Sequence, residues 1–335
     1  MPTRRSPVLD RQFDPQATVT RAGSSDHGDA AAGRSPAIGK VGFVGLGHMG
    51  TAMAANLAAA GCHVVGYVRR QGVMGGIQGL GVTPTMDIAD MFDSEIVISM
   101  LPDDDAVRSV VFGTGDTEGL AAGLPPGAIH LSMSTISTAA AAECASEHAR
   151  CGQGYVAAPV FGNPDAAKAR QLFVMAAGSP IDVERCRLLT DNLGQTFVVG
   201  DDPAQANLIK LLGNIMTATT LEVLGETVAV LRRRGFDPRR FIDILTSTMF
   251  AGRVHRIYGN KIVEESYAPG FVMPLALKDV RLALAEAEKA GVPMPSAAVV
   301  RDRMTAGIAR GHAGLDWTAL ALVAAEESEA GGRAT

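Results

Sequence analysis

Lys210 and Asn214 are the two residues whose types and spacing best suit proton transfer. They stand four positions apart in a segment with a helical apolar period, so one helix face would carry both side chains. Apolar neighbours such as Leu211 and Ile215 would desolvate the amine and lower its pKa from about 10.4 toward about 7–8, which suits a general acid and base. A lysine that merely extends from an amphipathic helix into solvent is the alternative.

A second pattern, Gly45-Leu46-Gly47-His48-Met49-Gly50, follows a short apolar run and opens a helical stretch. In such a strand–turn–helix frame, the first glycine allows a tight turn and the second lets a pyrophosphate approach the backbone. The third lets helix and strand pack closely, and the N–H groups at the helix start bind phosphate. These residues are therefore predicted to bind a dinucleotide; a glycine-rich turn without a ligand is the alternative.

The end of the second apolar run indicates which dinucleotide is bound. An acidic residue there would accept from the ribose 2′-hydroxyl of NAD, but this chain has Arg69 and Arg70. Forked guanidinium donors suit the 2′-phosphate of NADP. We therefore predict that NADP(H) is preferred, with NAD(H) also possible, the alternative being that both arginines are simply solvated.

The elements that must position these residues alternate between strands and helices up to about residue 200. Apolar runs predict strands within 40–47, 63–68, 95–101, 128–133, 155–160, 172–178 and 196–200, and helices are expected between several of them, for example over 48–61 and 136–150. This alternation is typical of a parallel sheet covered on both faces.

Beyond residue 202 only helical patterns follow. A helix of nearly thirty residues ends at Arg232, Arg233, Arg234 and Gly235, and further helices are expected near 238–248, 253–265, 274–291, 295–311 and 316–327. We predict an α/β fold with an N-terminal dinucleotide-binding domain over 38–200 and an all-helical C-terminal domain over 201–328. Residues 1–37 and 329–335 are expected to be disordered tails.

Composition sets limits on the class of protein. The 335 residues include 19% charged and 47% hydrophobic residues with a net charge of −5, which excludes a wholly disordered chain and gives no support for binding nucleic acid or a membrane surface. The cysteines Cys62, Cys144, Cys151 and Cys186 are scattered, so we expect reduced thiols, a cytoplasmic protein and no metal site.

Five short motifs, taken in order after the glycine turn, resemble those of the β-hydroxyacid dehydrogenase family. This family includes 3-hydroxyisobutyrate dehydrogenase and is related to 6-phosphogluconate dehydrogenase and to imine reductases. The resemblance covers about residues 40–322 and rests on Ser99–Pro102, Ser134–Ser137, Ala158–Gly162, Lys210–Asn214 and Lys278-Asp279. It implies a Rossmann domain with a doubly wound parallel sheet, a long interdomain helix, an all-α domain, and assembly as a homodimer or homotetramer.

The resemblance also implies a role for individual residues. Lys210 matches the catalytic lysine of the family, and the substrate-binding positions correspond to Ser134, Gly162, Asn163 and Asn214. Besides the glycine turn and the arginines, the residues expected to contact the cofactor are Leu101, Pro102, Thr135 and Lys278. Two alternatives involve no ligand. In one, Ser134 and Thr135 cap the next helix; in the other, Lys278 and Asp279 form a surface ion pair.

Three departures from the family pattern concern the substrate. Ser132 stands where an aspartate is usual, Phe161-Gly162-Asn163 replaces a Ser-Gly-Gly segment, and a second family glycine is replaced near Arg170. These changes favour a more apolar substrate than small 3-hydroxy acids. The leading hypothesis is an NADP-dependent enzyme acting on a hydroxyl or carbonyl carbon. The alternatives are an imine reductase, against which Lys210 argues, and a dinucleotide-binding protein without turnover.

Overall fold

Nine of the strands form one twisted sheet whose central members are buried on both faces, and β5 (Gly113–Thr114) and β6 (Thr117–Glu118) form a separate two-stranded hairpin. In the computed structural model, which describes residues 39–332, the sheet order is β11-β10-β8-β7-β4-β1-β2-β3, with β9 paired to β10. The bounds are β1 (Lys40–Val44), β2 (His63–Tyr67), β3 (Thr83–Thr85), β4 (Ile96–Ser99), β7 (Ile129–Ser132), β8 (Gly154–Ala157), β9 (Val160–Phe161), β10 (Leu172–Ala177) and β11 (Gly194–Gly200).

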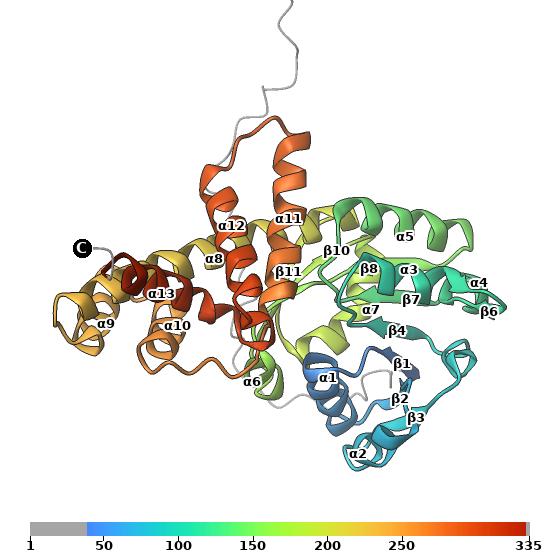
Figure 1. The fold of residues 1–335 in the computed structure, drawn as a ribbon. Helices are drawn as coiled ribbons and strands as arrows, with labels where there is room; N and C mark the ends of the chain where they lie inside the picture. The colour runs from blue at the N-terminus through green and yellow to red at the C-terminus, as the bar shows by residue number, and fades with distance from the viewer. Residues whose placement is uncertain (1–38, 333–335) are drawn as a thin grey trace, which may run out of the picture. The chain divides into compact units, whose positions relative to one another are not determined.

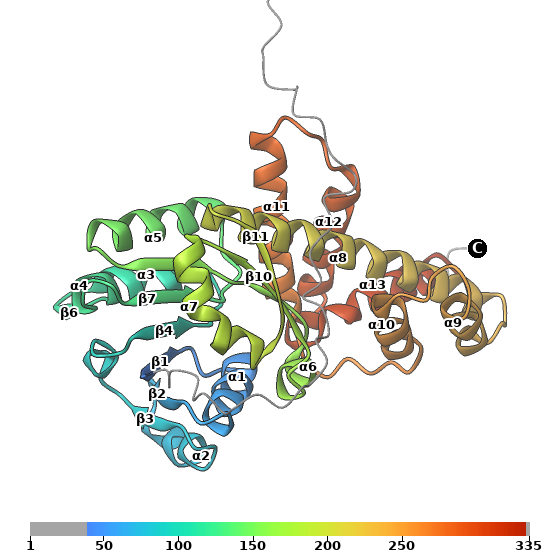
Figure 2. The same ribbon diagram turned by 180° about the vertical axis from the view of Figure 1, so that it is seen from behind.

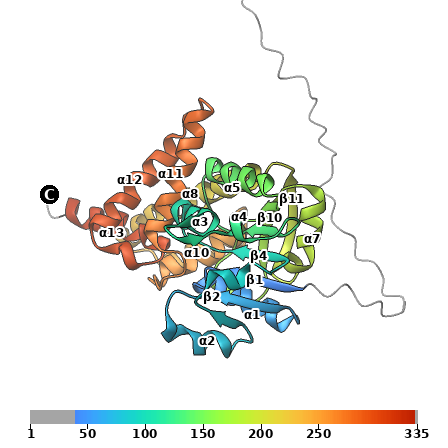
Figure 3. The same ribbon diagram turned by 90° about the vertical axis from the view of Figure 1, so that its right-hand side faces the viewer.

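Helices cover both faces of this sheet, and the alternation of buried residues along the strands shows why. Phe43 of β1 points into a cluster formed with α1 (His48–Ala59) and α7 (Pro180–Asp191), whereas its neighbour Val44 joins a cluster on the opposite face. On that face lie α3 (Asp104–Phe112), α4 (Leu120–Gly123) and α5 (Thr138–Arg150). Figure 3 shows α1 and α7 separated by the strands from α3 and α5.

Parallel register brings the carboxyl ends of five strands to one edge. Val44 of β1 lies opposite Tyr67 of β2 and Ser99 of β4, and Ser132 of β7 lies opposite both Ser99 and Ala157 of β8. Every loop that follows these strands therefore starts at the same edge. The candidate functional residues of the first 162 positions follow these strand ends or lie close after them.

The sheet differs from the expected doubly wound arrangement at one junction. β10 runs antiparallel to β8 and to β9, and it pairs in parallel only with β11. The chain turns back through the two-residue strand β9 and the short α6 (Pro164–Lys168), which form a hairpin-like return rather than a helical crossover. The mixed α/β class is confirmed, with this one antiparallel step.

A single long helix leads from the sheet into a group of helices. α8 (Pro203–Arg233) begins at an Asp202 cap and packs against α5, α10, α11 and α13 (Figures 1 and 2). The other helices of this group are α9 (Pro238–Thr246), α10 (Arg253–Val263), α11 (Met273–Lys289), α12 (Pro295–Ala309) and α13 (Leu320–Gly332). Their core holds large side chains such as Leu221, Met273, Met304 and Trp317.

Two sequence expectations concern the ends of the chain. α13 continues to Gly332, into the segment expected to be a C-terminal tail, and the expected N-terminal tail lies outside the described residues. Within the described part, α8 alone is long and apolar enough for a membrane span. Half of its most apolar window is buried against the rest of the protein, as in a core helix.

Candidate active site

The glycine turn between β1 and α1 has the shape that its sequence predicts. Gly45 has φ +98°, and a Cβ there would lie 2.3 Å from the Met100 carbonyl oxygen. A Cβ on Gly50 would lie 2.0 Å from the Gly45 carbonyl oxygen, whereas one on Gly47 would meet nothing within 4 Å. Two glycines therefore permit close packing, and the third leaves open space beside the backbone that a pyrophosphate could fill.

The start of α1 is suited to an anion. Gly47 is the N-cap residue and offers no side-chain acceptor to the first N–H groups, and no acidic residue stands in the first turn. His48 is exposed and Met49 is half-buried, so the N-terminal end of the helix faces outward. Unpaired N–H groups and the positive end of the helix dipole together favour phosphate. The fold thus fits the phosphates of a dinucleotide.

Arg69 and Arg70 follow β2 after one buried residue, Val68, at the same sheet edge, and both are exposed. The last β2 residue, Tyr67, lies opposite Val44, the residue before the glycine turn. Gly66 allows the two loops to approach, since a Cβ there would lie 2.7 Å from Leu46 Cδ1. The arginines are therefore positioned beside the glycine turn and open to solvent.

The loops after β4 and β7 are tied together by Ser134. Its Oγ accepts from the Leu101 N–H at 2.8 Å and lies 3.5 Å from the Ser99 carbonyl oxygen, and the residue is fully buried. Pro102, which follows Leu101 in this loop, is exposed. The serine predicted to bind substrate thus holds the loop that carries Leu101 and Pro102, and one lone pair of its oxygen has no assigned partner.

The predicted lysine and asparagine of α8 form a buried hydrogen bond. Lys210 Nζ donates to Asn214 Oδ1 at 2.8 Å, and Asn214 Nδ2 donates to Asp279 Oδ2 of α11 at 2.6 Å. Lys210 is 8% exposed, Asn214 5% and Asp279 2%. A chain from amine to amide to carboxylate therefore fixes the direction of the amine.

The electrostatics of this chain affect the proton affinity of the amine. Burial lowers the pKa of Lys210 to about 8, the negative charge of Asp279 raises it, and the nearby ammonium of Lys278 lowers it. The amine is thus close to half-protonated near pH 8. A group that both donates and accepts a proton works best at such a pH.

Lys278 connects the helical region to the sheet edge. Its Nζ donates to the Thr135 carbonyl oxygen and lies 3.0 Å from Asp279 Oδ1 as an ion pair. The predicted residues Thr135, Lys210, Asn214 and Lys278 are therefore brought together around Asp279. One alternative from the sequence was a surface ion pair between Lys278 and Asp279. The structure shows that this ion pair is largely buried.

Two functional candidates, Asn207 and Asp279, were not among the site residues that the sequence predicts. Asn207 is fully buried one helical turn before Lys210; its Oδ1 accepts from the Ile136 N–H at 3.1 Å, and its Nδ2 has no hydrogen-bond partner among residues 39–332. The only sequence signal for it is an amide on the same helix face as Lys210. The sequence indicates Asp279 only as an ion-pair partner of Lys278. Its contact with Asn214 joins residues 65 positions apart, which a local pattern does not reveal.

The segment after β8 places an aromatic ring against the amine. Lys210 Nζ lies 4.5 Å from the centre of the Phe161 ring, which also packs against Gly213, where a Cβ would lie 2.3 Å from Phe161 Cζ. Gly162 has φ +142°, and its Cβ would clash with Leu172. Asn163 caps α6, with Oδ1 accepting from the Ala166 N–H at 2.9 Å.

Two protein-family models match this chain, one to each part. The model of the NAD-binding domain of 6-phosphogluconate dehydrogenase matches residues 40–200. A second model, described as the NAD-binding domain of NADP-dependent 3-hydroxyisobutyrate dehydrogenase, matches residues 204–324.

Individual relatives match over nearly their whole length. An uncharacterized oxidoreductase of Bacillus subtilis is 36% identical over 84% of this chain and 98% of its own, and 2-hydroxy-3-oxopropionate reductase of Escherichia coli is 29% identical over 84% and 95%. A solved 3-hydroxyisobutyrate dehydrogenase of Salmonella typhimurium superposes with a TM-score of 0.77 at 22% identity, covering 85% of this chain and 99% of its own. A solved imine reductase of Bacillus cereus shares the fold with a TM-score of 0.54 at 20% identity, covering 84% of this chain and 97% of its own.

Proposed function

This chain belongs to the β-hydroxyacid dehydrogenase family, and on that premise we propose that Lys210 is the general acid and base of its reaction. The family assignment makes the protein a dehydrogenase that acts on CH–OH groups with a nicotinamide dinucleotide. The finer proposal is that NADP(H) is preferred and that the reacting carbon alternates between hydroxyl and carbonyl.

One observation carries the proposed role of Lys210. Its amine is buried, aimed by Asn214, and has a pKa lowered to about 8 by burial. Burial of a charged amine costs free energy, and here the amine is compensated by a neutral amide and an aromatic ring rather than by a direct ion pair, which a lysine with a purely structural role does not need. The nearest carboxylate, Asp279, contacts Asn214 rather than the amine.

The chemistry divides between cofactor and protein. Bound NADPH supplies the hydride that a carbonyl carbon accepts. The Lys210 ammonium donates a proton to the carbonyl oxygen, and in the reverse direction the neutral amine removes the hydroxyl proton. Asn214 keeps the amine in one orientation through Oδ1, and its own amide is held by Asp279. A well-placed acid of this kind contributes about 10²–10⁴ in rate.

The remaining assignments concern binding. We place the substrate between Lys210 and the loops after β7 and β8, with contacts from Ser134, Gly162, Asn163 and Asn214. The cofactor would contact the glycine turn and, beyond it, Leu101, Pro102, Thr135 and Lys278. Ser134 would accept a hydrogen bond from a substrate hydroxyl with its unassigned lone pair, because its own proton is directed to the Ser99 carbonyl oxygen. Asn163 would donate to the substrate through its amide N–H, because its Oδ1 already caps α6.

Phe161 supports a substrate with an apolar part. Its ring occupies the space beside Gly213 and lies against the Lys210 amine, where a carboxylate-binding segment would need polar groups. We therefore favour aldehydes, ketones or oxo acids with a hydrocarbon portion that can pack on this ring. Imine reduction is the second candidate.

A substrate panel tests the proposed function. Consumption of NADPH and NADH would be followed with aldehydes, 3-oxo acids and cyclic imines under identical conditions. We expect turnover of carbonyl compounds and higher kcat/KM with NADPH. Turnover of imines alone would contradict the carbonyl chemistry, and tight cofactor binding without any turnover would favour the non-catalytic alternative.

Three further expectations accompany this function as proposals. The division into a dinucleotide-binding domain over 38–200 and a helical domain over 201–328 follows the change from strands to helices. A cytoplasmic location is proposed from the unpaired state of the four cysteines. Assembly as a homodimer or homotetramer is proposed from the family resemblance.

A further inference from the structure

The short segment between β7 and α5 is anchored to the sheet side of the molecule at both of its ends. At its start, Ser134 Oγ accepts from the Leu101 N–H at 2.8 Å, which ties the segment to the loop after β4. At its end, the Ser137 N–H donates to Asp104 Oδ1 of α3 at 2.9 Å. The middle of the segment is held by a different part of the molecule.

One peptide group in the middle of this segment is bound at both of its polar atoms. The Thr135 carbonyl oxygen accepts from Lys278 Nζ of α11, and the Ile136 N–H donates to Asn207 Oδ1 of α8 at 3.1 Å. The carbonyl and the N–H belong to the same planar unit and point in opposite directions. Two side chains from the helical region therefore hold this peptide from opposite sides. We call this arrangement the 135–136 clamp.

Asn207 stands on the face of α8 that carries the candidate catalytic residues. It precedes Lys210 by three residues and Asn214 by seven, which places the three side chains in one row along the helix. All three residues are buried, and Asn207 has no exposed surface. The residue that holds the Ile136 N–H and the residue that carries the amine are therefore only about 4.5 Å apart along one helix axis.

The hydrogen bonding of Asn207 is incomplete, and this bears on why an asparagine stands there. Its Oδ1 is used by Ile136, whereas Nδ2 is buried without a partner in the part of the chain that the structure describes. An unpartnered buried donor destabilises a fold. A leucine at this position would remove that donor but would leave the Ile136 N–H unpartnered in its place. Stability alone therefore gives little reason for an asparagine, and what the asparagine adds is the fixed peptide.

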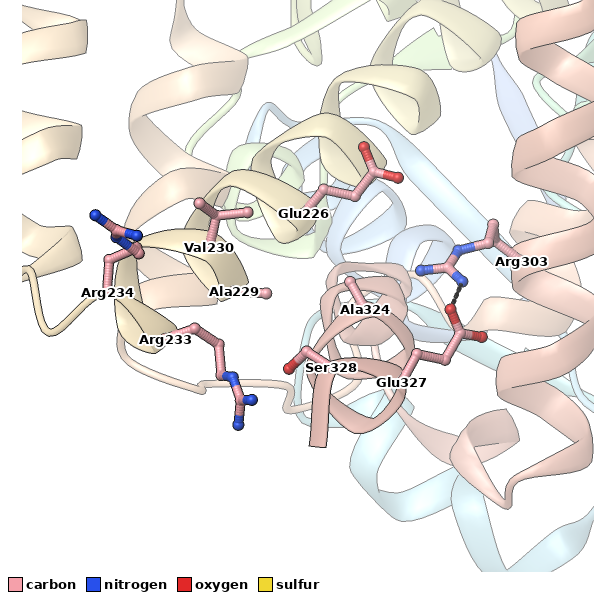
Figure 4. A pocket seen from close by; sticks show the side chains of 9 residues that line it. All are labelled: Glu226, Ala229, Val230, Arg233, Arg234, Arg303, Ala324, Glu327 and Ser328. Atoms are coloured by element: carbon pink, nitrogen blue, oxygen red, sulfur yellow. Dashed lines mark hydrogen bonds and ion pairs between the residues drawn. The ribbon is translucent and has the colours of Figure 1, made fainter. Parts of the chain in front are cut away.

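A second buried polar residue of α8 has no such link to the candidate site. Glu222 is 4% exposed, its Oε1 accepts from Arg303 Nε at 2.6 Å, and its Oε2 has no partner within residues 39–332. Arg303 also pairs with Glu327 and lines a surface hollow of about 420 Å³ toward the C-terminal end of α8 (Figure 4). Glu222 lies about 18 Å along the helix axis from Lys210, so it provides a matched control for Asn207.

We propose that Asn207 is a positioning residue for the reaction, because it fixes the Thr135–Ile136 peptide to the helix that carries Lys210. Ser134 and Thr135, the proposed contacts of substrate and cofactor, then keep a constant distance from the Lys210 amine. This role depends on the proposed function of Lys210, and it needs no contact of Asn207 with the substrate or the cofactor.

Single-turnover hydride transfer to a carbonyl substrate tests this role. The measurement is made with saturating NADPH at pH 6.5, because Lys210, with a pKa of about 8, is then mainly in its ammonium form. Asn207→Leu should slow hydride transfer at least tenfold and change the Kd for NADPH less than threefold. Asn207→Asp keeps an oxygen for the Ile136 N–H and should recover most of the rate.

Two control variants separate positioning from general stability. Glu222→Gln changes a buried polar residue of the same helix away from the site. Thr138→Val removes a different contact between α5 and α11, the hydrogen bond of Thr138 Oγ1 to Glu286. Both variants should transfer hydride within twofold of the wild-type rate. A rate that follows the thermal unfolding midpoint across all these variants would give Asn207 a merely structural role and overturn the proposal.

A double variant tests whether Asn207 acts through the shared peptide. Lys278→Met removes the other half of the 135–136 clamp. If both side chains hold one peptide, loss of either one already frees it. The variant with both Asn207→Leu and Lys278→Met should therefore be no slower, within about twofold, than the slower single variant. Rate losses that multiply would show that the two residues act independently, and this would contradict the clamp.

Hydrogen exchange of the Ile136 amide tests the clamp without any turnover. Mass spectrometry with fragmentation to single residues should show exchange at least tenfold faster in Asn207→Leu than in the wild type, and near the wild-type rate in Asn207→Asp. Unchanged exchange in Asn207→Leu would overturn the clamp even in an active enzyme. Absence of carbonyl turnover in the wild type would instead contradict the proposed function, and with it the role of Asn207 in the reaction.

Discussion

At the level of single residues, Asn214 and Asp279 together control the amine of Lys210. Lys210 donates to Asn214, which is itself fixed by Asp279, so the carboxylate acts on the lysine through an intervening amide. This arrangement separates orientation from charge. The amide sets the direction of Nζ, and the distance of the carboxylate leaves burial as the dominant influence on the pKa of Lys210.

The protonation of Lys210 predicts opposite pH profiles for the two reaction directions. Reduction needs the ammonium, so its kcat/KM should fall as pH rises through about 8; oxidation needs the neutral amine and should fall as pH drops through about 8. Both profiles would be measured between pH 6 and 10 with a substrate that does not titrate. Profiles of the same shape in both directions would argue against a shared acid–base group.

Asp279→Asn should move the midpoint of the pH profile for reduction to lower pH. The carboxylate raises the pKa of Lys210, so its neutral isostere should shift the limb for reduction to lower pH and reduce the rate at pH 8 severalfold. Asp182→Asn on α7, far along the chain from this cluster, serves as a control. A midpoint unchanged by Asp279→Asn would mean that the carboxylate is purely structural.

The double variant Arg69→Ala, Arg70→Ala should affect the two cofactors unequally. Loss of the guanidinium groups removes contacts that only a 2′-phosphate can make, so the Kd for NADPH should rise by at least tenfold more than the Kd for NADH. Isothermal titration with both cofactors measures the difference. Arg187→Ala, on an exposed face of α7, is the control, and equal losses for NADPH and NADH would remove the argument for NADP.

At the scale of elements, a buried hydrogen-bond relay supports the strand ends. Ser99 and His130 are 2.8 Å apart, His130 and His148 are 2.9 Å apart, and His148 Nδ1 lies 2.7 Å from Gln153 Oε1. The Gln153 amide then donates to two carbonyl oxygens near α4. The relay links α4 and α5 to β7 and to the end of β4, next to the loop that holds Leu101.

This relay predicts loss of stability in acid. Burial lowers the pKa of both His130 and His148, so the folded protein holds them neutral while the unfolded chain takes up protons below about pH 6.5. Stability should therefore be full above that pH and decrease as pH falls, by up to about 1.4 kcal/mol per pH unit for each imidazole. Urea unfolding at pH 7, 6 and 5 measures this decrease.

His148→Gln isolates the contribution of the relay. The variant should be less stable at pH 7 but should lose less stability between pH 7 and 5 than the wild type, since one titrating group is gone. Exposed His63→Gln should keep the wild-type slope. A slope identical in the wild type and His148→Gln would show that these imidazoles do not govern acid unfolding.

The sequence predicted most elements because their apolar patterns are long or strongly bounded. The runs at β1, β4 and β7 are buried throughout or nearly so, and glycine, proline and aspartate mark the ends of most helices. β3 was missed because its three residues, Thr83-Pro84-Thr85, carry no apolar run. The antiparallel direction of β10 was missed because a strand pattern does not encode direction.

In the candidate site too, the sequence predicts the local features but not the contacts between residues far apart in the chain. The glycine turn is local, so its geometry follows from six consecutive residues. The contacts of Lys210 are partly local, through Asn214, and partly remote, through Asp279, and only the folded chain shows the remote one. The roles of Ser134 in joining two loops and of Asn163 in capping α6 likewise depend on tertiary contacts or on helix bounds.

At the scale of the whole described molecule, contacts between the helical region and the sheet edge complete the site. Lys278 reaches the Thr135 carbonyl oxygen, and Asn207 accepts from the Ile136 N–H. Thr138 at the start of α5 donates to Glu286 of α11 at 2.7 Å. The loop after β7 is thus held by residues from α8 and α11, which positions the lysine relative to the strand ends.

Single-turnover hydride transfer in Lys210→Met measures whether Lys210 transfers the proton. The variant keeps the length of the side chain and removes the amine. We expect an unchanged Kd for NADPH and a hydride-transfer rate lowered by at least about 10² at pH 7, with Lys289→Met, on an exposed lysine, as the control. Hydride transfer by Lys210→Met at the wild-type rate would contradict this role.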